Sequence, residues 1–333
     1  MRTSEAMRKR NWTGSNRKIA IITLVVGCSV RPNTRMISDL KSLVDPLGQP
    51  EFLALLRERK LTFLPGCGSH RFETLLNWET LNYLLDSATL PLAELRVVRE
   101  SVPIPTNIYV RQGRVDSAAL SKLLDRGVSL VFNMLHEHVP ALRRLCKNLA
   151  RDTLEQISAA AVVTSGRGGA IKCHYDDQDL IILQIAGTKS WRVFNSPIGN
   201  SVSNMAAGSP EGPPVFDQVL EPGDLLFLPA RFWHHCENGP NRSLHVSILF
   251  IPPNGQHVMT ALMSQLSSDE TFNRPLTRHS SLESLAEHET ALKVRLVETI
   301  RTISLDRLLT ERAASGLLES IQLDRQEDQG CNV

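Results

Sequence analysis

Hydrophobic positions follow two different periods along the chain, and the changes of period divide it. Between residues 37 and 157, and again from 256 onward, most apolar residues recur every three or four positions, as in amphipathic helices. Between 158 and 252, short apolar runs are separated by Gly, Pro and Asn, which is typical of antiparallel β-structure. The β-type runs are 159–164, 180–185, 190–194, 225–228 and 244–251. This middle part therefore predicts a β-sandwich or barrel with helical flanks.

Within the first part, the helical period predicts helices over 77–85, 117–124 and 140–154, with a short β-type run over 127–132. We expect three regions: an extension over 1–35, a domain over 36–255 with its β core at 158–252, and a C-terminal helical region over 256–333.

The expected extension carries six basic residues and one acidic residue in its first 18 positions, followed by an apolar run over 19–30. That run is shorter than the roughly 20 residues that cross a bilayer. The pattern weakly resembles a secretory or lipoprotein signal. We favour the alternative of a disordered or mis-started segment with Met36 as the functional start, and thus a cytoplasmic protein that binds no membrane.

Composition narrows the function classes further. The 333 residues are 42% hydrophobic and 22% charged, which excludes wholesale disorder. Lys and Arg number 37 against 35 Asp and Glu, so the net charge of +2 gives no reason to expect a nucleic-acid partner. Six cysteines form no pair of the CxxC type and are expected to be free thiols.

The residues with the most specific chemistry are His174 and Asp176, which project from the same side of an extended chain because they are two apart. A closed β-barrel brings distant strands together. His234 follows a Pro-Gly-Asp turn at 222–224 and an apolar strand. Two histidines and one carboxylate form the facial triad of non-heme Fe(II) oxygenases. The neighbouring His235 would point the opposite way, so we expect His234 to be the ligand.

The motifs at 174–179 (His-Tyr-Asp-Asp-Gln-Asp), 183–191, 222–234 and 243–247 together resemble the JmjC/cupin-type 2-oxoglutarate oxygenases, and most closely their ribosomal oxygenase group. The resemblance implies a double-stranded β-helix (jelly-roll) core. It also implies that His174, Asp176 and His234 are the catalytic Fe(II) ligands and that 2-oxoglutarate is the co-substrate.

Lys189 is the candidate for binding that co-substrate. With Trp191 and Val193 it forms an i, i+2 stripe, which places a cation on an apolar face, and that is costly unless an anion pairs with it. The resemblance implies that Lys189 binds the far carboxylate of 2-oxoglutarate, and that Thr164 and Ser247 add hydroxyl donors. A surface lysine and ordinary strand hydroxyls are the alternatives.

Several positions depart from the pattern of the family or have two interpretations. Val162 stands where a tyrosine that helps to hold the co-substrate is common, and Arg231 stands where glycine is common. Asp177 and Asp179 either orient a metal ligand or belong to a solvated loop. His245 is expected in the core or the wall of the site rather than as a fourth ligand, and the 136–138 segment (His-Glu-His) is expected on the surface.

The resemblance implies hydroxylation of a protein or peptide side chain, a ribosomal protein first, with succinate and CO2 as co-products. Demethylation of methyl-lysine is chemically open but ranks lower. The family resemblance also suggests a homodimer formed through the C-terminal helices, although these helices could merely cap the barrel. The alternatives are a cupin metal enzyme that does not use 2-oxoglutarate, which would usually carry three His and one Glu, and a catalytically silent binding module.

Overall fold

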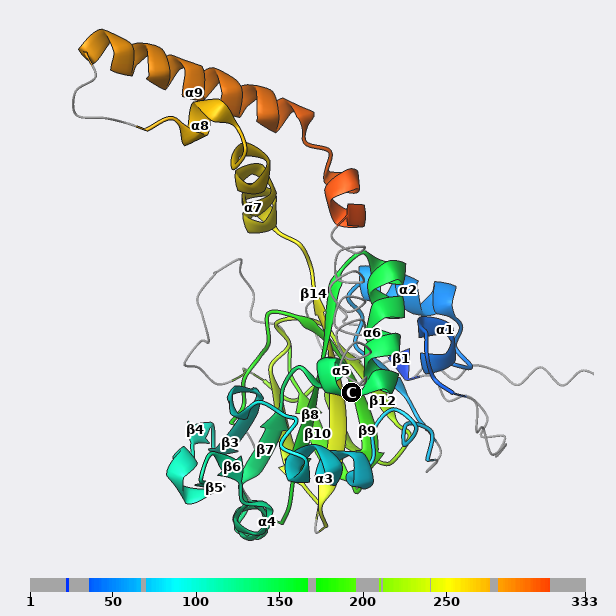
Figure 1. Cartoon of the computed structure of the whole chain (residues 1–333). Helices are drawn as coiled ribbons and strands as arrows, with labels where there is room; N and C mark the ends of the chain where they lie inside the picture. Colours follow the sequence, from blue (N-terminus) through cyan, green and yellow to red (C-terminus); the bar gives the residue numbers. More distant parts are fainter. Residues whose placement is uncertain are drawn as a thin grey trace, which may run out of the picture. The chain divides into compact units, whose positions relative to one another are not determined.

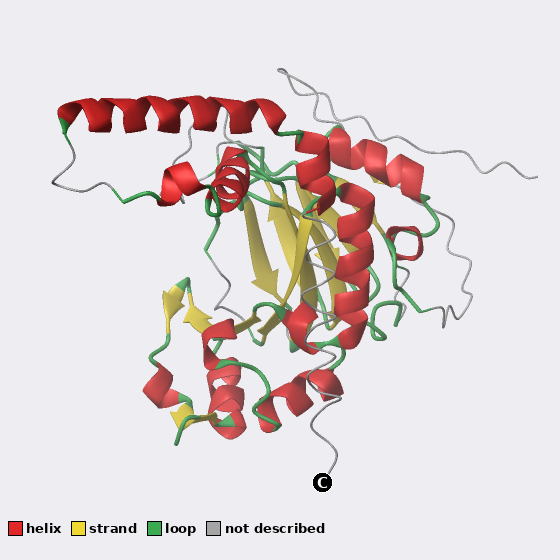
Figure 2. Ribbon diagram, turned by 45° about the horizontal axis from the view of Figure 1, so that its top comes forward, coloured by secondary structure: helices red, strands yellow, loops and turns green. Residues whose placement is uncertain are grey.

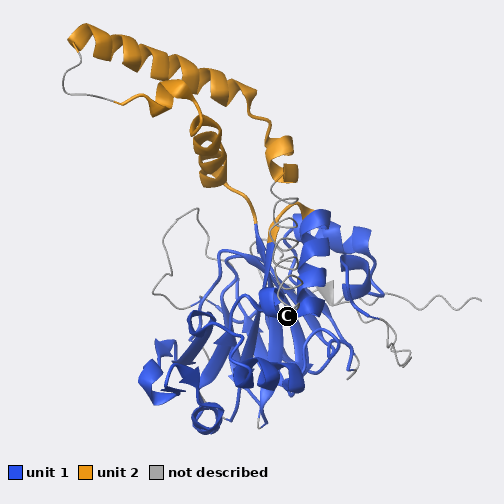
Figure 3. Cartoon of the chain, in the orientation of Figure 1, with its two compact units in different colours: residues 1–152, 157–251 blue, residues 153–156, 252–333 orange. Residues whose placement is uncertain are grey.

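The protein is represented by a computed structural model that describes residues 22–23, 36–66, 70–166, 172–195, 210, 212–239, 241–275 and 281–311. Contacts divide the chain into two units (Figure 3): residues 1–152 with 157–251, and residues 153–156 with 252–333. Of the expected extension over 1–35, only the two residues of strand β1 (Ile22–Thr23) are described, and the rest lies outside the described residues.

The first unit combines helices with a large amount of β-structure (Figure 1). Its helices are α1 (Leu40–Leu43), α2 (Gln49–Arg57), α3 (Trp78–Asp86), α4 (Ser117–Asp125), α5 (Leu135–His138) and α6 (Pro140–Thr153). Its further strands are β2 (Thr62–Leu64), β3 (Leu95–Arg99), β4 (Val102–Pro103), β5 (Val110–Arg111), β6 (Arg114–Val115), β7 (Ser129–Phe132), β8 (Gln156–Thr164), β9 (Asp179–Ala186), β10 (Lys189–Val193), β11 (Phe216–Leu220), β12 (Leu225–Leu228), β13 (His234–Asn238) and β14 (Ser243–Ile251).

Two sheets of the described strands build the core of this unit. The large sheet has the order β1-β2-β12-β9-β14-β8-β7-β3-β4, and the small sheet has the order β11-β10-β13. Strands β9 and β12 pair antiparallel, as do β9 and β14, and β10 pairs antiparallel with both of its neighbours. The five β-type runs of the sequence correspond to β8, β9, β10, β12 and β14, so the mainly β fold with helical flanks is confirmed.

The two faces of the large sheet bury different partners. One face contributes Ile181, Leu183 and Val246 to a core that also contains helical residues such as Leu142 and Leu145 of α6. Figure 2 shows helices running beside these strands. The opposite face packs against the small sheet, in a second core made by these side chains: Leu180, Ile182, Leu226 and Leu228 of the large sheet with Trp191, Val193, Phe216, Leu220 and Cys236 of the small sheet. This sandwich of two sheets has the strand arrangement of a double-stranded β-helix.

Two turns place the strands that carry the candidate site. Gly187 joins β9 to β10 with φ +64°, and a Cβ there would lie 2.1 Å from the Arg242 carbonyl oxygen, so only glycine fits. The Pro-Gly-Asp turn before β12 is held by Asp224, whose carboxylate accepts hydrogen bonds from the backbone N–H groups of Gly66 (2.6 Å) and Glu221 (2.8 Å). Both turns therefore depend on the residues that the sequence motif supplies.

The segment expected to be mostly helical, residues 37–157, also supplies strands to the large sheet. The predicted helices are present as α3, α4 and α6, and the predicted run at 127–132 is β7. Strands β2 and β3, however, were not expected. β2 pairs with β12 and β3 pairs with β7, so each of these short runs is stabilised by a partner distant in sequence rather than by its own pattern.

The second unit is helical in its described part and contains α7 (Gly255–Leu266), α8 (Glu270–Asn273) and α9 (Leu282–Thr302). His288 of α9 is buried, and its Nε2 lies 2.9 Å from the Thr271 carbonyl oxygen of α8. Arg295 of α9 donates to Asp269, the N-cap of α8, at 2.5 Å. Among the described helices, none has the length and hydropathy needed to cross a membrane.

Candidate metal centre

Two backbone hydrogen bonds bring the candidate ligands together. The N–H of His174 donates to the His234 carbonyl oxygen (3.1 Å), and the N–H of His234 donates to the His174 carbonyl oxygen (2.7 Å). This antiparallel bridge places the two imidazoles side by side, with ring centroids 4.3 Å apart. The N–H of Arg231 donates to the Asp176 carbonyl oxygen (2.7 Å), which ties the turn before β13 to the third candidate ligand.

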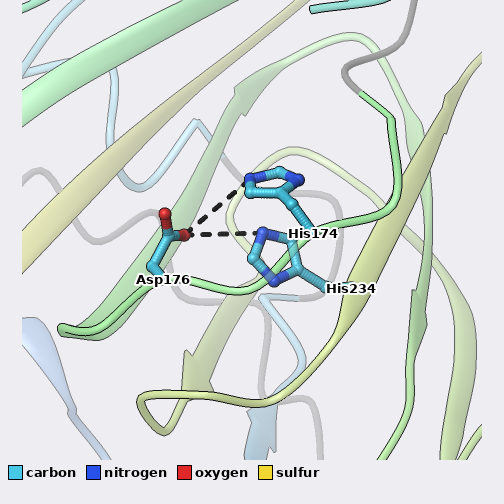
Figure 4. Close-up of side chains that lie close together, drawn as sticks. All are labelled: His174, Asp176 and His234. Atoms are coloured by element: carbon cyan, nitrogen blue, oxygen red, sulfur yellow. Dashed lines mark ion pairs between the residues drawn. The ribbon is translucent and has the colours of Figure 1, made fainter. Parts of the chain in front are cut away.

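The three side chains converge on one point (Figure 4). The Nε2 atoms of His234 and His174 lie 3.6 Å and 4.0 Å from Asp176 Oδ2, and one ligand atom from each residue lies within 4.8 Å of the others. Ligand atoms at about 2.1 Å from an ion and at right angles would lie about 3 Å apart. Small side-chain adjustments would therefore let all three coordinate one metal ion.

The Nδ1 contacts of both histidines leave Nε2 free to bind a metal. His174 Nδ1 lies 2.8 Å from the Lys172 carbonyl oxygen, and His234 Nδ1 lies 3.1 Å from the Phe232 carbonyl oxygen. A carbonyl can only accept, so each Nδ1 carries the proton and each Nε2 keeps a lone pair directed toward Asp176. These backbone contacts fix the orientation of the rings as they do in known metal sites.

Burial differs sharply among the three residues. The His234 side chain is 4% exposed, whereas those of His174 and Asp176 are 29% and 35% exposed. Burial, and then the proximity of His174, lower the pKa of His234 to about 4. The imidazole is therefore neutral near pH 7, which is the form that binds a metal. The site is closed on the His234 side and open on the side of the other two ligands.

The donor set fits iron(II). Two imidazole nitrogens and one carboxylate oxygen form the facial triad that leaves coordination positions free on a non-heme Fe(II). They differ from the three histidines and one glutamate expected of other cupin metal enzymes. Among the described residues, this group is the one in which at least three His, Cys, Asp or Glu side chains could hold a metal ion.

Lys189 lies on the inner face of β10, as the i, i+2 stripe predicted. It is 3% exposed, and no anionic group among the described residues pairs with it. Burial lowers the pKa of its ammonium group. A buried cation that lacks a counter-ion is strongly disfavoured unless a ligand supplies one. The surface alternative for Lys189 is wrong, and its position fits a residue that binds an anion.

Thr164 and Ser247 also face the small sheet. Thr164 ends β8 on the face opposite Val163, is 1% exposed, and its hydroxyl has no hydrogen-bond partner in the described part of the chain. Ser247 of β14 stands opposite Ile182 of β9, whose side chain belongs to the core between the sheets. Both hydroxyls thus lie on the inner face of the large sheet, whereas Lys189 lies on that of the small sheet, and no described contact joins either hydroxyl to Lys189.

The neighbouring residues of the motif have structural partners instead. His235 stands opposite Arg192 in the small sheet and lies 3.6 Å from Glu237, so it points away from the three candidate ligands. Asp179 accepts from the N–H of Ala230 (2.6 Å), and Asp177 lies 3.2 Å from Arg231 Nε. The two aspartates thus hold the turn before β13, and neither forms a described hydrogen bond to a ligand histidine.

Arg231 adopts a left-handed backbone conformation, with φ +67°. This explains why glycine is common at the position, because glycine adopts that conformation without strain. Val162 packs with Val98 and Val131 and offers no hydrogen-bond donor.

Two inner-face residues were not expected to have a polar role. The indole Nε1 of Trp191 and the Nδ1 of His245 are buried without a hydrogen-bond partner among the described residues. The spacing of Trp191 from Lys189 was a usable signal, since it predicts a common face. No local pattern could show that the indole N–H would be left without an acceptor.

The 136–138 segment was expected on the surface, but the structure places it in a half-buried position. The side chains of His136 and His138 are 13% and 17% exposed. His138 Nε2 lies 2.6 Å from Glu94 Oε2, and His136 Nδ1 accepts from the N–H of Ala159 at 3.3 Å. The hydrogen bonds link α5 to β8 and to Glu94, the residue before β3, so this segment is a half-buried structural contact. The cysteines that the structure describes, Cys146, Cys173 and Cys236, are free thiols as expected.

Comparison with known proteins agrees with this geometry. Residues 135–258 match the family model of the JmjC domain. The chain is 26% identical over 219 residues to the bifunctional lysine-specific demethylase and histidyl-hydroxylase NO66 of Drosophila mojavensis, a match that covers 60% of this chain and 24% of that protein. It is 24% identical over 290 residues to the uncharacterized protein YxbC of Bacillus subtilis, covering 80% of this chain and 87% of YxbC.

The fold is also found in a solved structure, that of the ribosomal oxygenase YcfD from Escherichia coli in complex with cobalt and 2-oxoglutarate. The two chains superpose with a TM-score of 0.51 at 19% identity, over 76% of this chain and 66% of YcfD. This chain spans only about a quarter of the length of the Drosophila protein. Residues 135–258 thus match the JmjC domain, and over part of its length the chain is similar to NO66 in sequence and to YcfD in fold.

Proposed function

We propose that this chain is an Fe(II)- and 2-oxoglutarate-dependent oxygenase that hydroxylates a protein or peptide side chain. The observation that carries the proposal is the convergence of His174 Nε2, His234 Nε2 and the Asp176 carboxylate, with both Nδ1 protons held by backbone carbonyls. Fe(II) held by these residues would use dioxygen and 2-oxoglutarate to oxidise a C–H bond, with succinate and CO2 as co-products.

The other residues of the inner face bind and orient the co-substrate. Lys189 pairs with the far carboxylate of 2-oxoglutarate and thereby gains the counter-ion that it lacks. The hydroxyls of Thr164 and Ser247 donate to the same end of the molecule. Around them, Ile182 and Leu226 of the large sheet form an apolar surround, which excludes water and strengthens the ion pair.

A protein substrate is supported by the exposure of the site and by the relatives. His174 and Asp176 are more exposed than His234, so the side of the centre that a bulky substrate can approach lies next to them. NO66 is named as a demethylase and histidyl-hydroxylase, and YcfD as a ribosomal oxygenase. We rank hydroxylation of a ribosomal protein first and demethylation of methyl-lysine second.

The test is succinate formation by the purified full chain with Fe(II), 2-oxoglutarate and dioxygen. Asp176→Ala should abolish both Fe(II) binding and succinate formation, whereas His235→Ala, the matched neighbour that faces away, should retain both. Mass spectrometry of ribosomal proteins from cells with and without this protein should then show the gain of one oxygen atom on one of them. Absence of Fe(II) binding and of succinate formation in the unaltered chain would refute the proposal.

We also propose that the chain forms a homodimer through the second unit. Helix α9 exposes Val294, Val297 and Ile300 at three-residue spacing, and α7 exposes Met259 and Met263. Such rows of exposed apolar side chains are typical of association surfaces. Light scattering at micromolar concentration should give the mass of a dimer, and Val297→Glu should shift it to that of a monomer. A monomeric mass for the unaltered chain would contradict this.

A further inference from the structure

Trp191 and His245 face each other on the inner faces of two different sheets. Trp191 is 2% exposed and His245 is 3% exposed, and their ring centroids lie 5.5 Å apart in an edge-to-face arrangement. The indole also stacks on His234, with centroids 5.8 Å apart. Trp191 therefore contacts both a candidate metal ligand and a residue of β14.

Both side chains have a buried polar atom without a partner in the part of the chain that the structure describes: Trp191 Nε1 and His245 Nδ1. An indole N–H can only donate, and a neutral imidazole also carries one N–H. Gln184, opposite His245 on β9, donates through its amide nitrogen to Ala186, Gly187 and Ser243; its Oε1 also has no described partner, and no described hydrogen bond joins it to the imidazole. Buried donors without an acceptor are rare, so an occupant that supplies acceptor atoms is expected.

The charges around these atoms favour an anionic occupant. Lys189 shares the inner face of β10 with Trp191 and brings an uncompensated positive charge. Burial, followed by the nearby charges of Lys189 and His234, holds the pKa of His245 well below its ordinary value, so that the ring is neutral near pH 7. The hydroxyl of Thr164 is a further buried group without a described hydrogen-bond partner. All of these groups can donate to a carboxylate.

We propose that Trp191 Nε1–H and the His245 imidazole donate hydrogen bonds to the far carboxylate of 2-oxoglutarate, the one that pairs with Lys189. The inference rests on the proposed function and extends it to two further co-substrate-binding residues. Val162, in an apolar cluster with Val98 and Val131, offers no hydrogen-bond donor to this carboxylate.

Calorimetric titration of the Mn(II)-loaded full chain tests this directly. The two probes are 2-oxoglutarate and 2-oxopentanoate, which has the same five-carbon chain and the same chelating end but lacks the far carboxylate. Trp191→Phe, which keeps an aromatic ring on His234, and His245→Leu should each weaken 2-oxoglutarate binding by about tenfold. Binding of 2-oxopentanoate at millimolar concentration should stay unchanged. His245→Gln, which restores an N–H donor, should recover part of the loss.

Matched substitutions outside the site serve as controls. Trp78→Phe in α3 and His288→Leu in α9 remove the same groups from other cores and should leave both titrations unchanged. Equal weakening of both probes would show that the rings act on the metal end, and unchanged binding of 2-oxoglutarate would show that water satisfies these atoms; either result overturns the inference. If the unaltered chain binds Mn(II) but not 2-oxoglutarate, the proposed function fails first, and the inference fails with it.

Discussion

Two histidine clusters in the first unit look alike in the sequence and differ in the structure. One comprises His174, Asp176 and His234, and the other comprises His136 and His138 with their glutamate partners. Both place imidazoles within a few ångströms of carboxylates, and both are largely sheltered from solvent.

The clusters differ in how their ring nitrogens are used. In the helical cluster, His138 Nε2 contacts Glu94, while His136 uses Nδ1 for the Ala159 N–H and Nε2 for Glu137 at 3.2 Å. In the strand cluster, both Nδ1 atoms are engaged, but both Nε2 atoms are left facing a carboxylate that they do not reach by a normal hydrogen bond. Ring nitrogens engaged by hydrogen bonds stabilise a fold, whereas converging lone pairs can bind a metal.

The largest effect that would test this contrast is the removal of a converging ligand. We expect His234→Ala to reduce succinate formation by at least about a thousandfold, because the metal supplies several kcal/mol of transition-state stabilisation. The equivalent change in the other cluster, His138→Ala, should leave the rate per folded molecule within about twofold, because no hydrogen bond or ion pair described for His138 involves the three candidate ligands. Comparable losses in both variants would erase the distinction between the clusters.

Lys189 differs from the side chains of the structural cluster in its charge, because it is a buried cation without a described counter-ion. Lys189→Met should weaken 2-oxoglutarate binding by about 100-fold or more, because truncating one partner of a buried charge pair is costly. The same change should raise the Tm of the ligand-free chain by about 2 to 4 °C, since it removes a buried cation that has no described counter-ion. Calorimetric binding and thermal unfolding of the same samples measure both. A lower Tm with unchanged binding would identify Lys189 as a structural residue.

The pH dependence of stability provides a finer test of Lys189. Burial lowers the pKa of Lys189 in the folded protein below its ordinary value of 10.5. At pH values between the folded and the unfolded pKa, the unfolded chain therefore binds more protons than the folded chain. The free energy of unfolding of the ligand-free protein should therefore rise with pH toward 10.5. Lys189→Met should lack this contribution. A rise of equal size in the variant would assign it to other groups.

The structural cluster should respond in stability alone. His138→Gln removes a short hydrogen bond between side chains that are 17% and 25% exposed. We expect the Tm to fall by about 2 to 6 °C while the Michaelis constant for 2-oxoglutarate stays the same. Differential scanning calorimetry measures the first quantity and steady-state kinetics the second. A change in the Michaelis constant without a change in Tm would contradict the structural role.

The same two clusters show what the sequence can and cannot reveal. The i, i+2 spacing of His174 and Asp176 predicted a common side, and the Pro-Gly-Asp turn predicted where His234 would follow, since both signals are local. Strand β13, which begins at His234, was not predicted because its polar residues acquire β-structure only by pairing with β10. The partial burial of His136 and His138 was missed for a related reason: Glu94 and Ala159, which engage them, are distant in sequence.

The smallest effect concerns Asp177, which follows the candidate ligand Asp176 in the chain but is not one of the three converging side chains. Its side chain is 55% exposed and contacts Arg231 at 3.2 Å. Exposed ion pairs contribute little, so Asp177→Asn should change the free energy of unfolding by less than about 0.5 kcal/mol and leave Fe(II) affinity within about twofold. Asp176→Asn, made one residue earlier, should lose Fe(II) affinity strongly because an amide oxygen replaces a charged ligand. If both substitutions weakened Fe(II) binding equally, proximity to the motif, rather than convergence of lone pairs, would define the site.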